Sequence, residues 1–325
     1  MRVVQAVRFG EPEVLVPTEA PAPVAGAGQV VIEVSVAAID FVQTQIRRGF
    51  TPGPPLPTPP YVPGASIAGR VRAVGPGTDP AWIGRRVVTH TASGYGGNAE
   101  LAAAEVEALI PVPDGLGLPE AAALLDDGAT ALALAETAGI RPDEWVLVAA
   151  AAGGVGSLLV QLARVAGARV IGAVGSTPKR ELVRDELGAA VVVDYSSPGW
   201  PDRVRAATGG RGPDLVFDGV GGQIGRDAFA ITADGGRFSV HGASSGAATV
   251  IDPADAHRRR VAVIGLEQLQ TFPVGARFRA ERMVADAAAG RIRPTIGRTF
   301  PLEQAAAAHT AMEAREVLGK ALLVT

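Results

Sequence analysis

The sequence predicts an α/β protein that combines a doubly wound parallel sheet with a second, mostly β domain. Apolar runs of strand length alternate with helical patterns between residues 145 and 265. Short strand-like runs separated by proline and glycine dominate the first 110 residues. The chain has 325 residues, which is enough for two domains that each bury a core.

The N-terminal region is expected to be built mainly from strands. They are expected at residues 3–9, 29–36 and 66–74, with the same pattern continuing at residues 84–88 and 94–101. The proline- and glycine-rich stretches 17–28 and 51–63 read as loops. Residues 119–138 follow as a helix, since Pro119 and Glu120 suit a helix start and alanine and leucine recur behind them.

The second region predicts six parallel strands joined by crossover helices. The strands are expected at residues 146–150, 169–174, 190–194, 215–218, 237–241 and 261–265. A helix at 277–289, an extended piece near 299–300, a helix at 302–314 and a last strand at 321–324 complete the chain. These last elements are best placed back on the first domain. Residues 126–264 are therefore expected to form a domain inserted between residues 1–125 and 265–325.

Residues 145–176, WVLVAAAAGGVGSLLVQLARVAGARVIGAVGS, carry the strongest functional signal. A strand is followed at once by Gly153, Gly154 and Gly156, and then by an amphipathic helix and a second strand. Glycine lets the backbone approach a pyrophosphate, and a helix N-terminus supplies free N–H groups and positive dipole. Ala151 stands where the first glycine of the dinucleotide motif is usual. The alternative to a dinucleotide site is a turn in which glycine only permits tight packing. A membrane span is a second alternative, but the paired glycines and polar residues of this region argue against it.

The end of the second strand predicts NADPH rather than NADH. An NAD site usually carries an acid there, about 20 residues after the first glycine. Here the strand runs into Gly175, Ser176 and Thr177, followed by Lys179 and Arg180, so hydroxyls and cations replace the acid. The chain has only two lysines, which makes Lys179 more suggestive. The alternative is that these cations are solvated charges in the first turn of the next helix.

Composition excludes several other classes of function. A formal charge of −3 gives no basic surface for nucleic acid. The absence of cysteine excludes disulfides, thiolate metal ligands and a cysteine nucleophile. The N-terminus shows no secretion signal, and no membrane partner is expected. A cytoplasmic protein is therefore expected.

Many segments, in order along nearly the whole chain, resemble the zinc-independent quinone oxidoreductase (zeta-crystallin-like) branch of the medium-chain dehydrogenase/reductase superfamily. They are AIDFVQTQIRRG (38–49), PYVPGASIAGRVRAVGPG (60–77), DGATALALAE (127–136), AAAGGVG (150–156), GSTPK (175–179), VVDY (192–195), FDGVGG (217–222), HGASSG (241–246) and GKALL (319–323). The resemblance implies an NADPH-binding Rossmann domain at residues 126–264. Residues 1–125 with 265–325 would form a GroES-like catalytic domain.

The resemblance also implies roles for individual residues. Gly153, Gly154, Val155 and Gly156 would hold the pyrophosphate, and Ser176, Lys179 and Tyr195 match positions that contact the 2′-phosphate. Thr130 matches a residue beside the nicotinamide. The remaining cofactor contacts are expected at Ala152, Gly175, Val220, Gly242, Ser244, Ser245 and Lys320.

The sequence departs from the zinc-dependent relatives at the metal ligands. The Gly-His-Glu position of those enzymes reads Gly64, Ala65 and Ser66, and Asp40 stands near the position of a metal-binding cysteine. His90 is the only nearby imidazole, and two scattered ligands do not make a zinc site. We therefore expect no metal, and we interpret His90 as a histidine at a strand end.

The first active-site helix departs from the related quinone oxidoreductases. Relatives often show Asn-x-x-Asp-x-Tyr, whereas this chain has Asp40, Gln43 and Gln45. Together with Thr130, these residues are the predicted substrate- or nicotinamide-adjacent set, although surface polarity would also explain the glutamines. An amide has no acidic proton, so either water or another group, such as Tyr61 or Tyr95, would protonate the product.

These features predict an NADPH-dependent, metal-free reductase of quinones or α,β-unsaturated carbonyl compounds. One alternative is an enoyl reductase that acts on a thioester or polyketide intermediate. Another is an NADPH-binding or interaction protein without turnover. The resemblance implies a homodimer formed through residues 261–265. The loops at residues 51–63 and 267–275 are expected to form pocket walls.

Overall fold

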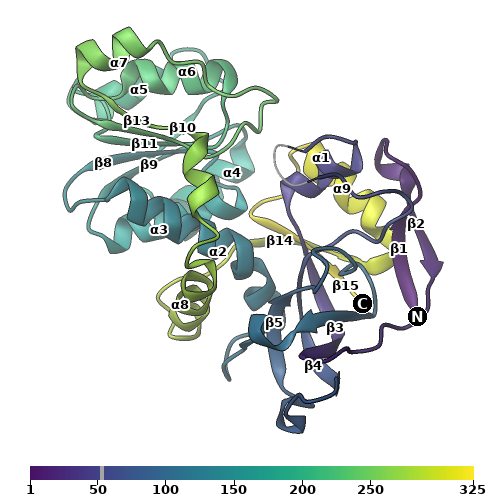
Figure 1. The fold of residues 1–325 in the computed structure, drawn as a ribbon. Helices are drawn as coiled ribbons and strands as arrows, with labels where there is room; N and C mark the ends of the chain where they lie inside the picture. Colours follow the sequence, from purple (N-terminus) through teal and green to yellow (C-terminus); the bar gives the residue numbers. More distant parts are fainter. Residues whose placement is uncertain (52–54) are drawn as a thin grey trace. The chain divides into compact units, whose positions relative to one another are not determined.

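The computed structural model describes residues 1–51 and 55–325, which form two compact units (Figure 1). Unit 1 consists of Met1–Asp126 and Ala280–Thr325, and unit 2 consists of Asp127–Arg279. Residues 52–54, which belong to the expected loop 51–63, lie outside the described residues. Unit 2 runs fifteen residues beyond the end predicted for the cofactor domain, and which domain carries which function stays a prediction.

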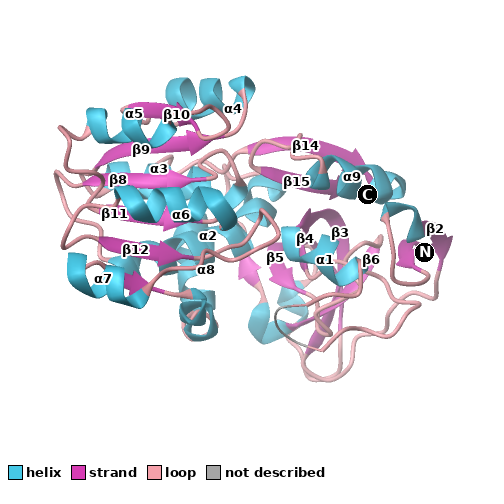
Figure 2. Cartoon of the chain, turned by 90° about the horizontal axis from the view of Figure 1, so that it is seen from above, coloured by secondary structure: helices cyan, strands magenta, loops and turns pink. Residues whose placement is uncertain are grey.

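Unit 2 contains a six-stranded parallel sheet in the order β10-β9-β8-β11-β12-β13 (Figure 2). Its strands are β8 (Trp145–Ala149), β9 (Arg169–Val174), β10 (Val191–Asp194), β11 (Leu215–Asp218), β12 (Arg237–Val240) and β13 (Ala262–Ile264). All neighbouring strands pair in parallel. The first strand of this sheet, β8, lies in the middle. The next two strands, β9 and β10, extend the sheet to one edge, and β11, β12 and β13 extend it to the other, so the strand order reverses between β8 and β11. Ligands of doubly wound sheets bind at the carboxyl ends of the strands at this reversal.

Helices cover both faces of this sheet, as the strand–helix alternation predicts. They are α3 (Gly154–Val165), α4 (Thr177–Glu181) with a π-helical turn Leu182–Glu186, α5 (Trp200–Ala207), α6 (Gly222–Ile231) and α7 (Pro253–Arg259). The helices α5 and α6 lie on one face and α3 lies on the other (Figure 1). The core against α5 and α6 contains Phe229 and Phe238, whose rings meet edge to face at 5.4 Å. Unit 2 is therefore a Rossmann domain in its architecture.

Unit 1 is built around a seven-stranded sheet in the order β14-β15-β3-β4-β5-β7, in which β6 also pairs with β3. Its strands are β3 (Gln29–Ile39), β4 (Ser66–Val74), β5 (Arg86–His90), β6 (Leu101–Glu105), β7 (Ile110–Pro111), β14 (Ile296–Pro301) and β15 (Lys320–Val324). The pair β1 (Arg2–Ala6) and β2 (Leu15–Glu19) forms a separate antiparallel ladder. Isoleucine, valine and leucine from β3, β4 and β15 fill the core together with the buried face of α9 (Ala305–Glu313). This unit has the mostly β, GroES-like architecture that the sequence predicts.

Three further helices complete the described chain. They are α1 (Phe41–Arg47), α2 (Leu118–Ala138) and α8 (Ala276–Ala288), and short 3₁₀ turns lie at Pro12–Val14, Pro80–Trp82, Val106–Ala108, Leu266–Thr271 and Leu302–Gln304. Within the part of the chain that the structure describes, every helix is too short or too polar to span a bilayer.

Two predicted elements are wrong in position or type. Residues 94–101 are mostly a loop, and the strand begins only at Leu101, because Gly94 and Gly96 take positive φ angles that a strand does not allow. The predicted helix 302–314 splits into a 3₁₀ turn and α9, since Leu302 is buried where the chain leaves β14.

Candidate functional site

The glycine-rich turn after β8 presents free N–H groups at the start of α3. Ala150 turns the chain with a φ of 57°, and Gly153 precedes the helix in an extended conformation. The first hydrogen bond of this helix start runs from the Ser157 N–H to the Gly153 carbonyl oxygen (2.8 Å). The N–H groups of residues 154–156 therefore have no acceptor within the helix, and they point out of the positive end of its dipole. This arrangement suits an anion such as a pyrophosphate.

The glycines of this turn are required for different reasons. A Cβ on Gly156 would lie 2.2 Å from the Ala150 carbonyl oxygen, and one on Gly154 would lie 1.9 Å from Asp127 Oδ2. The backbone therefore excludes a side chain at Gly156, whereas a side chain at Gly154 would require the Asp127 carboxylate to move. A Cβ on Gly153 would meet only the Ala150 oxygen, at 3.3 Å. This contact is tight but is the only one, so a Cβ at Gly153 would require the Ala150 oxygen to shift by a few tenths of an ångström.

The predicted 2′-phosphate contacts lie at the ends of the neighbouring strands β9 and β10. Ser176 precedes α4 without capping it through its side chain, and Lys179 lies within that helix. The Tyr195 N–H bonds to the Val174 carbonyl oxygen (2.9 Å), and the Tyr195 ring lies so close to Gly175 that a Cβ there would be 2.8 Å away. Strand β9 ends without a carboxylate, whereas β10 ends in Asp194, whose Oδ1 accepts hydrogen bonds from the Ser196 N–H (2.9 Å) and hydroxyl. The end of β9 therefore suits a phosphate group better than the end of β10.

Asp218, a residue that the sequence reasoning did not select, organises the loop after β11. Its side chain is fully buried, and it accepts hydrogen bonds from the N–H groups of Val220 (3.0 Å) and Gly221 (2.9 Å) and from Thr249 Oγ1. The Ser245 N–H in turn bonds to the Val220 carbonyl oxygen (2.8 Å). The loops after β11 and β12 are thus tied to one another.

The other predicted residues of these loops are also held by packing. The Ser244 N–H bonds to the Gly219 carbonyl oxygen (3.2 Å), and a Cβ on Gly242 would lie 2.8 Å from the same oxygen. Burial lowers the pKa of His241 to about 4, although the charge of Asp218 opposes the shift. The structure therefore brings Val220, Gly242, Ser244 and Ser245 to the carboxyl ends of β11 and β12. Thr130 lies half-buried within α2 of unit 2.

Asp40, Gln43, Gln45 and Lys320 lie in unit 1. Asp40 precedes α1, but its carboxylate does not cap that helix and instead pairs with Lys320 Nζ. Gln43 is buried, and its Nε2 lies 3.3 Å from the Ala38 carbonyl oxygen and 3.4 Å from Asp40 Oδ2. The Gln43 Oε1 atom has no hydrogen-bond partner among the described residues. Gln45 lies half-buried on the same helix.

A second charged pair of unit 1 was missed by the sequence reasoning. His90 Nε2 lies 2.8 Å from Asp126 Oδ1, and Ser66 Oγ donates to Asp126 Oδ2. Burial alone would raise the pKa of Asp126, but the bonds and charges of His90, Ser66 and Lys320 hold it well below its usual range. Burial alone would lower the pKa of His90, but the bond and charge of Asp126 and the charge of Asp40 raise it. The only signal for Asp126 was a pair of adjacent acids within a largely apolar helix.

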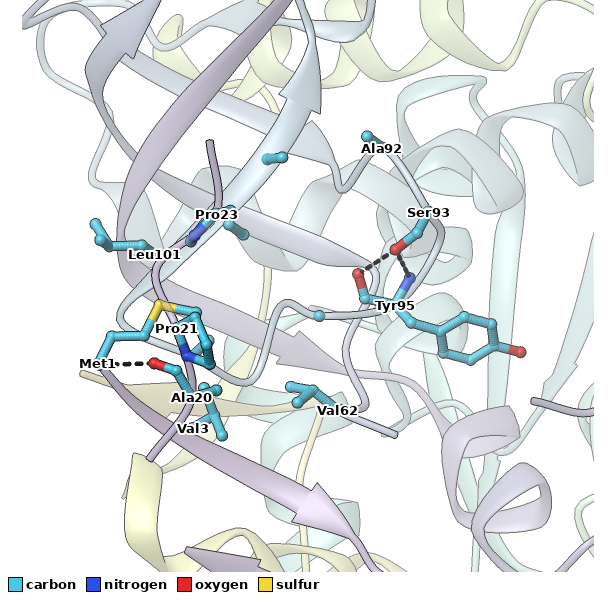
Figure 3. A pocket seen from close by; sticks show the side chains of 14 residues that line it. Met1, Val3, Ala20, Pro21, Pro23, Val62, Ala92, Ser93, Tyr95 and Leu101 are labelled. Carbon is cyan, nitrogen blue, oxygen red and sulfur yellow. Dashed lines mark hydrogen bonds between the residues drawn. The ribbon is translucent and has the colours of Figure 1, made fainter. Parts of the chain in front are cut away.

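The two tyrosines proposed as proton donors pack against one another. The rings of Tyr61 and Tyr95 meet edge to face, with centroids 5.5 Å apart. Burial, followed by the influence of Tyr95, raises the pKa of Tyr61 to about 12. A neighbouring apolar cavity of about 250 Å³ includes Tyr95 in its lining, but the Tyr95 ring points away from the apolar side chains around Met1 (Figure 3). Apart from Tyr95, none of the predicted site residues lines this cavity.

The residues of unit 1 do not fit a zinc ion. The chain has no cysteine, and the described residues contain no group of three or more histidines or acids that could hold a metal. The two nearest candidates are already engaged, since Asp40 pairs with the ammonium of Lys320 and His90 pairs with Asp126. A lysine ammonium beside the carboxylate also opposes a divalent cation.

Comparison with known proteins agrees with this two-domain arrangement. Residues 26–114 match the alcohol dehydrogenase GroES-like domain family, and residues 154–274 match the zinc-binding dehydrogenase family. The chain is 31% identical to quinone oxidoreductase of Rattus norvegicus, covering 95% of this chain and 93% of that protein. It is 32% identical to 2-haloacrylate reductase of Burkholderia sp., covering 92% of this chain and 91% of that protein.

A solved structure extends the comparison to the fold. Quinone oxidoreductase of Escherichia coli, solved in complex with NADPH, superposes with a TM-score of 0.89 at 28% identity, and the match covers 100% of both chains. The likeness therefore extends over both units. Sequence identity over nearly the full length, the parallel sheet and the donor set unsuited to zinc lead to one conclusion: the chain belongs to the zinc-independent quinone oxidoreductase branch of the medium-chain dehydrogenase/reductase superfamily.

Proposed function

We propose that this protein is an NADPH-dependent, metal-free reductase that transfers hydride to a quinone or an α,β-unsaturated carbonyl compound. The observation that carries the proposal is the start of α3, where three backbone N–H groups have no acceptor within the helix and glycine keeps the turn before them free of side chains. The relatives named quinone oxidoreductase and 2-haloacrylate reductase support the reaction class. The E. coli structure in complex with NADPH supports the cofactor.

The chain's own residues would hold the two ends of the cofactor. The N–H groups of Gly154, Val155 and Gly156 would bind the pyrophosphate, helped by the positive end of the α3 dipole. Ser176 and Lys179 would bind the 2′-phosphate through a hydroxyl and a cation. The loop organised by Asp218 would position the nicotinamide end, because its backbone is fixed by buried hydrogen bonds.

The proposed substrate class follows from the donor set. NADPH would supply the hydride, and the protein would orient it and exclude water. Because the residues of unit 1 do not suit a zinc ion, no Lewis acid is assigned to polarise an isolated ketone. In a conjugated carbonyl or a quinone, the negative charge left by hydride addition spreads onto oxygen. Side chains or water that donate hydrogen bonds are then sufficient to stabilise it.

The substitution Gly153→Ala tests the cofactor site directly. A Cβ there requires only a small shift of the Ala150 oxygen, so we expect the melting temperature to change little and NADPH binding to weaken by about tenfold or more. Binding is measured by calorimetric titration. Gly156→Ala is the contrasting variant, because its Cβ would meet the Ala150 carbonyl oxygen and should lower the melting temperature as well. Unchanged NADPH affinity in Gly153→Ala would remove this turn from the binding site.

Cofactor preference is tested at Lys179. Lys179→Met should weaken NADPH binding by about tenfold and leave NADH binding unchanged, since only NADPH carries the 2′-phosphate. Arg184→Met is the matched control, because Arg184 lies one turn further on and pairs with Asp185. Equal catalytic efficiency of the wild-type enzyme with the two cofactors would contradict the proposed preference.

Reduction of a carbon–carbon double bond in a thioester is a second candidate. The relative named 2-haloacrylate reductase supports the reduction of a carbon–carbon double bond, because that name specifies an unsaturated acid as the substrate. We would assay NADPH oxidation with 9,10-phenanthrenequinone, a 2-alkenal and crotonyl thioester, and identify the products by mass spectrometry. Preferential formation of the saturated thioester would favour the second candidate over quinone reduction.

We also infer a cytoplasmic homodimer that pairs through β13. This strand ends the sheet of unit 2 and pairs only with β12 among the described strands, and its Val263 is 41% exposed. Val263→Glu should shift the mass measured by light scattering from dimer to monomer. Val165→Glu, at an exposed position on α3, should not. A monomeric wild-type protein would refute the dimer, and cell fractionation tests the compartment.

A further inference from the structure

Five polar side chains from different elements meet in unit 1, and we name them the acid–base cluster: Asp40, Ser66, His90, Asp126 and Lys320. Two ion pairs form its centre, Asp40 with Lys320 and Asp126 with His90, and Ser66 donates to Asp126. The charge of Lys320 also acts on Asp126, and the charge of Asp40 acts on His90. The two pairs therefore behave as one electrostatic unit.

Within this cluster, Lys320 is a fixed charge rather than a mobile acid. Its side chain is only 5% exposed, and its ammonium group is held by Asp40. If this buried ammonium lost its proton, the half-buried Asp40 carboxylate would lose its cation, which is costly. Tyr61 is also a poor acid near neutral pH, because burial raises its pKa to about 12. Gln43 and Gln45 have no acidic proton to give.

One ring nitrogen of His90 is held by a carboxylate, and the side chain is open to solvent. Its Nε2 is held 2.8 Å from Asp126 Oδ1, while Nδ1 makes no hydrogen bond to any residue that the structure describes. The His90 side chain is 47% exposed, so it can regain a proton from water. The groups that face it are Asp126 from α2, Asp40 at the start of α1 and Lys320 from β15.

We propose that His90 is the catalytic proton donor of the reduction, and that Asp126 orients its ring and stabilises its charged form. This assignment rests on the proposed reductase function. The hydride adds to the β-carbon of the unsaturated carbonyl compound, and the electron pair of the double bond moves toward the carbonyl oxygen. The α-carbon then takes the proton from His90 Nδ1. The imidazole left behind takes a new proton from water, and Asp126 stays ionised throughout.

Two electronic effects support this role. Burial opposes the charged form of His90, but the bond and charge of Asp126 and the charge of Asp40 raise its pKa and so favour the protonated, proton-donating form. The depressed pKa of Asp126 keeps that residue as an acceptor, so it holds the ring without competing for the proton. The arrangement resembles other histidine–carboxylate pairs in which the acid fixes the orientation of the ring.

The test compares two substrates in the variant His90→Gln. Protonation of the α-carbon of an alkenal needs a positioned acid, whereas the oxygen anions of a reduced quinone take protons readily from water. We therefore expect kcat/KM for 2-hexenal to fall by about 10²-fold and kcat/KM for 9,10-phenanthrenequinone to change little. His257→Gln, on the exposed face of α7, is the matched control and should affect neither substrate. His90→Asn repeats the test if His90→Gln fails to fold.

A titration without substrate gives an independent measurement. The ring signal of His90, followed by NMR in wild-type protein without cofactor, should titrate above 6.5, and in Asp126→Asn it should titrate at a lower pH, because the bond and charge that raise its pKa are lost. In wild-type enzyme, kcat/KM for 2-hexenal should fall as pH rises through the same value. This alkaline limb should disappear in His90→Gln.

The possible outcomes separate the two levels of the proposal. Equal kcat/KM of His90→Gln and wild type with 2-hexenal, or an equal loss with both substrates, would overturn the role of His90 alone. A His90 titration that Asp126→Asn does not move would overturn the pairing. A wild-type enzyme that binds NADPH but reduces neither substrate would overturn the proposed function, and the role of His90 with it.

Discussion

His309 makes this protein sensitive to acid through burial. It lies in α9 with 0% exposure, and neither ring nitrogen has a hydrogen-bond partner among the described residues. Burial, followed by the charge of Arg47, lowers the pKa of His309 to about 3. The folded protein therefore holds this histidine neutral over most of the accessible pH range.

The size of the effect follows from the difference between the folded and unfolded states. The unfolded chain takes up a proton at His309 below a pKa of about 6.5, and the folded protein does so only near 3. The unfolded state thus binds more protons in this window, so the free energy of unfolding falls as pH falls from about 6.5 to about 3. At pH 5 the loss amounts to about 2 kcal/mol.

The substitution His309→Leu isolates this contribution. We expect the free energy of unfolding of the wild type, measured by urea denaturation, to fall between pH 7.5 and pH 5 by about 2 kcal/mol more than that of the variant. His241 contributes in the same direction but is present in both proteins, so its effect cancels in the comparison. His257→Gln should behave like the wild type, because His257 is exposed.

Equal losses in wild type and His309→Leu would refute this reasoning, since they would show that the histidine is charged or solvated in the folded state. An NMR titration of His309 with a midpoint near 6.5 would lead to the same conclusion. A variant that is less stable at pH 7.5 but loses less stability on going to pH 5 would still support the reasoning. The stability at pH 7.5 reports packing, and the change with pH reports protonation.

Three further substitutions test the scaffold and the site. Asp218→Asn should lower the free energy of unfolding by about 2 kcal/mol and weaken NADPH binding, because the amide cannot accept all the bonds from the loop and from Thr249. Urea denaturation measures the first effect and calorimetric titration the second. An unchanged affinity for NADPH would show that this loop does not contribute to cofactor binding. Arg47→Met should cost about 3 kcal/mol, since it leaves Glu313 without its buried partner, and a loss under 1 kcal/mol in thermal unfolding would contradict this. Gln45→Ala should reduce kcat/KM for 2-hexenal, and an unchanged value would remove Gln45 from the predicted substrate contacts.

The Rossmann part of the fold was predictable because its signals are local. Strand β9 (Arg169–Val174) and strand β11 (Leu215–Asp218) lie where the sequence predicts them, since each is a short apolar run bounded by turn residues. The glycine turn before α3 also lies where it was predicted, for the same reason. The wrong strand at residues 94–101 arose because its glycines adopt positive φ angles, which alternating polarity does not reveal.

The candidate site was only partly predictable, and Asp218 and Asp126 show why. Asp218 ends a strand of ordinary sequence, and its importance lies in the three donors that the folded loops bring to it. In the sequence, Asp126 is only a polar residue within a helix, and the folded structure shows that its carboxylate contacts His90 and Ser66. Asp40 and Lys320 were both selected as single residues, but nothing in the sequence indicated that they pair.

The sequence by itself determined the family, the parallel sheet and the position of the glycine-rich turn, because these depend on residues within a few positions of one another. Only the tertiary structure determined which residues come together in the acid–base cluster. Its members stand at positions 40, 66, 90, 126 and 320, and sheet pairing of β15 with β3 and of β4 with β5 brings their elements together. The pKa of an ionisable side chain depends on the charges and the solvent around it, and those surroundings exist only after the chain has folded.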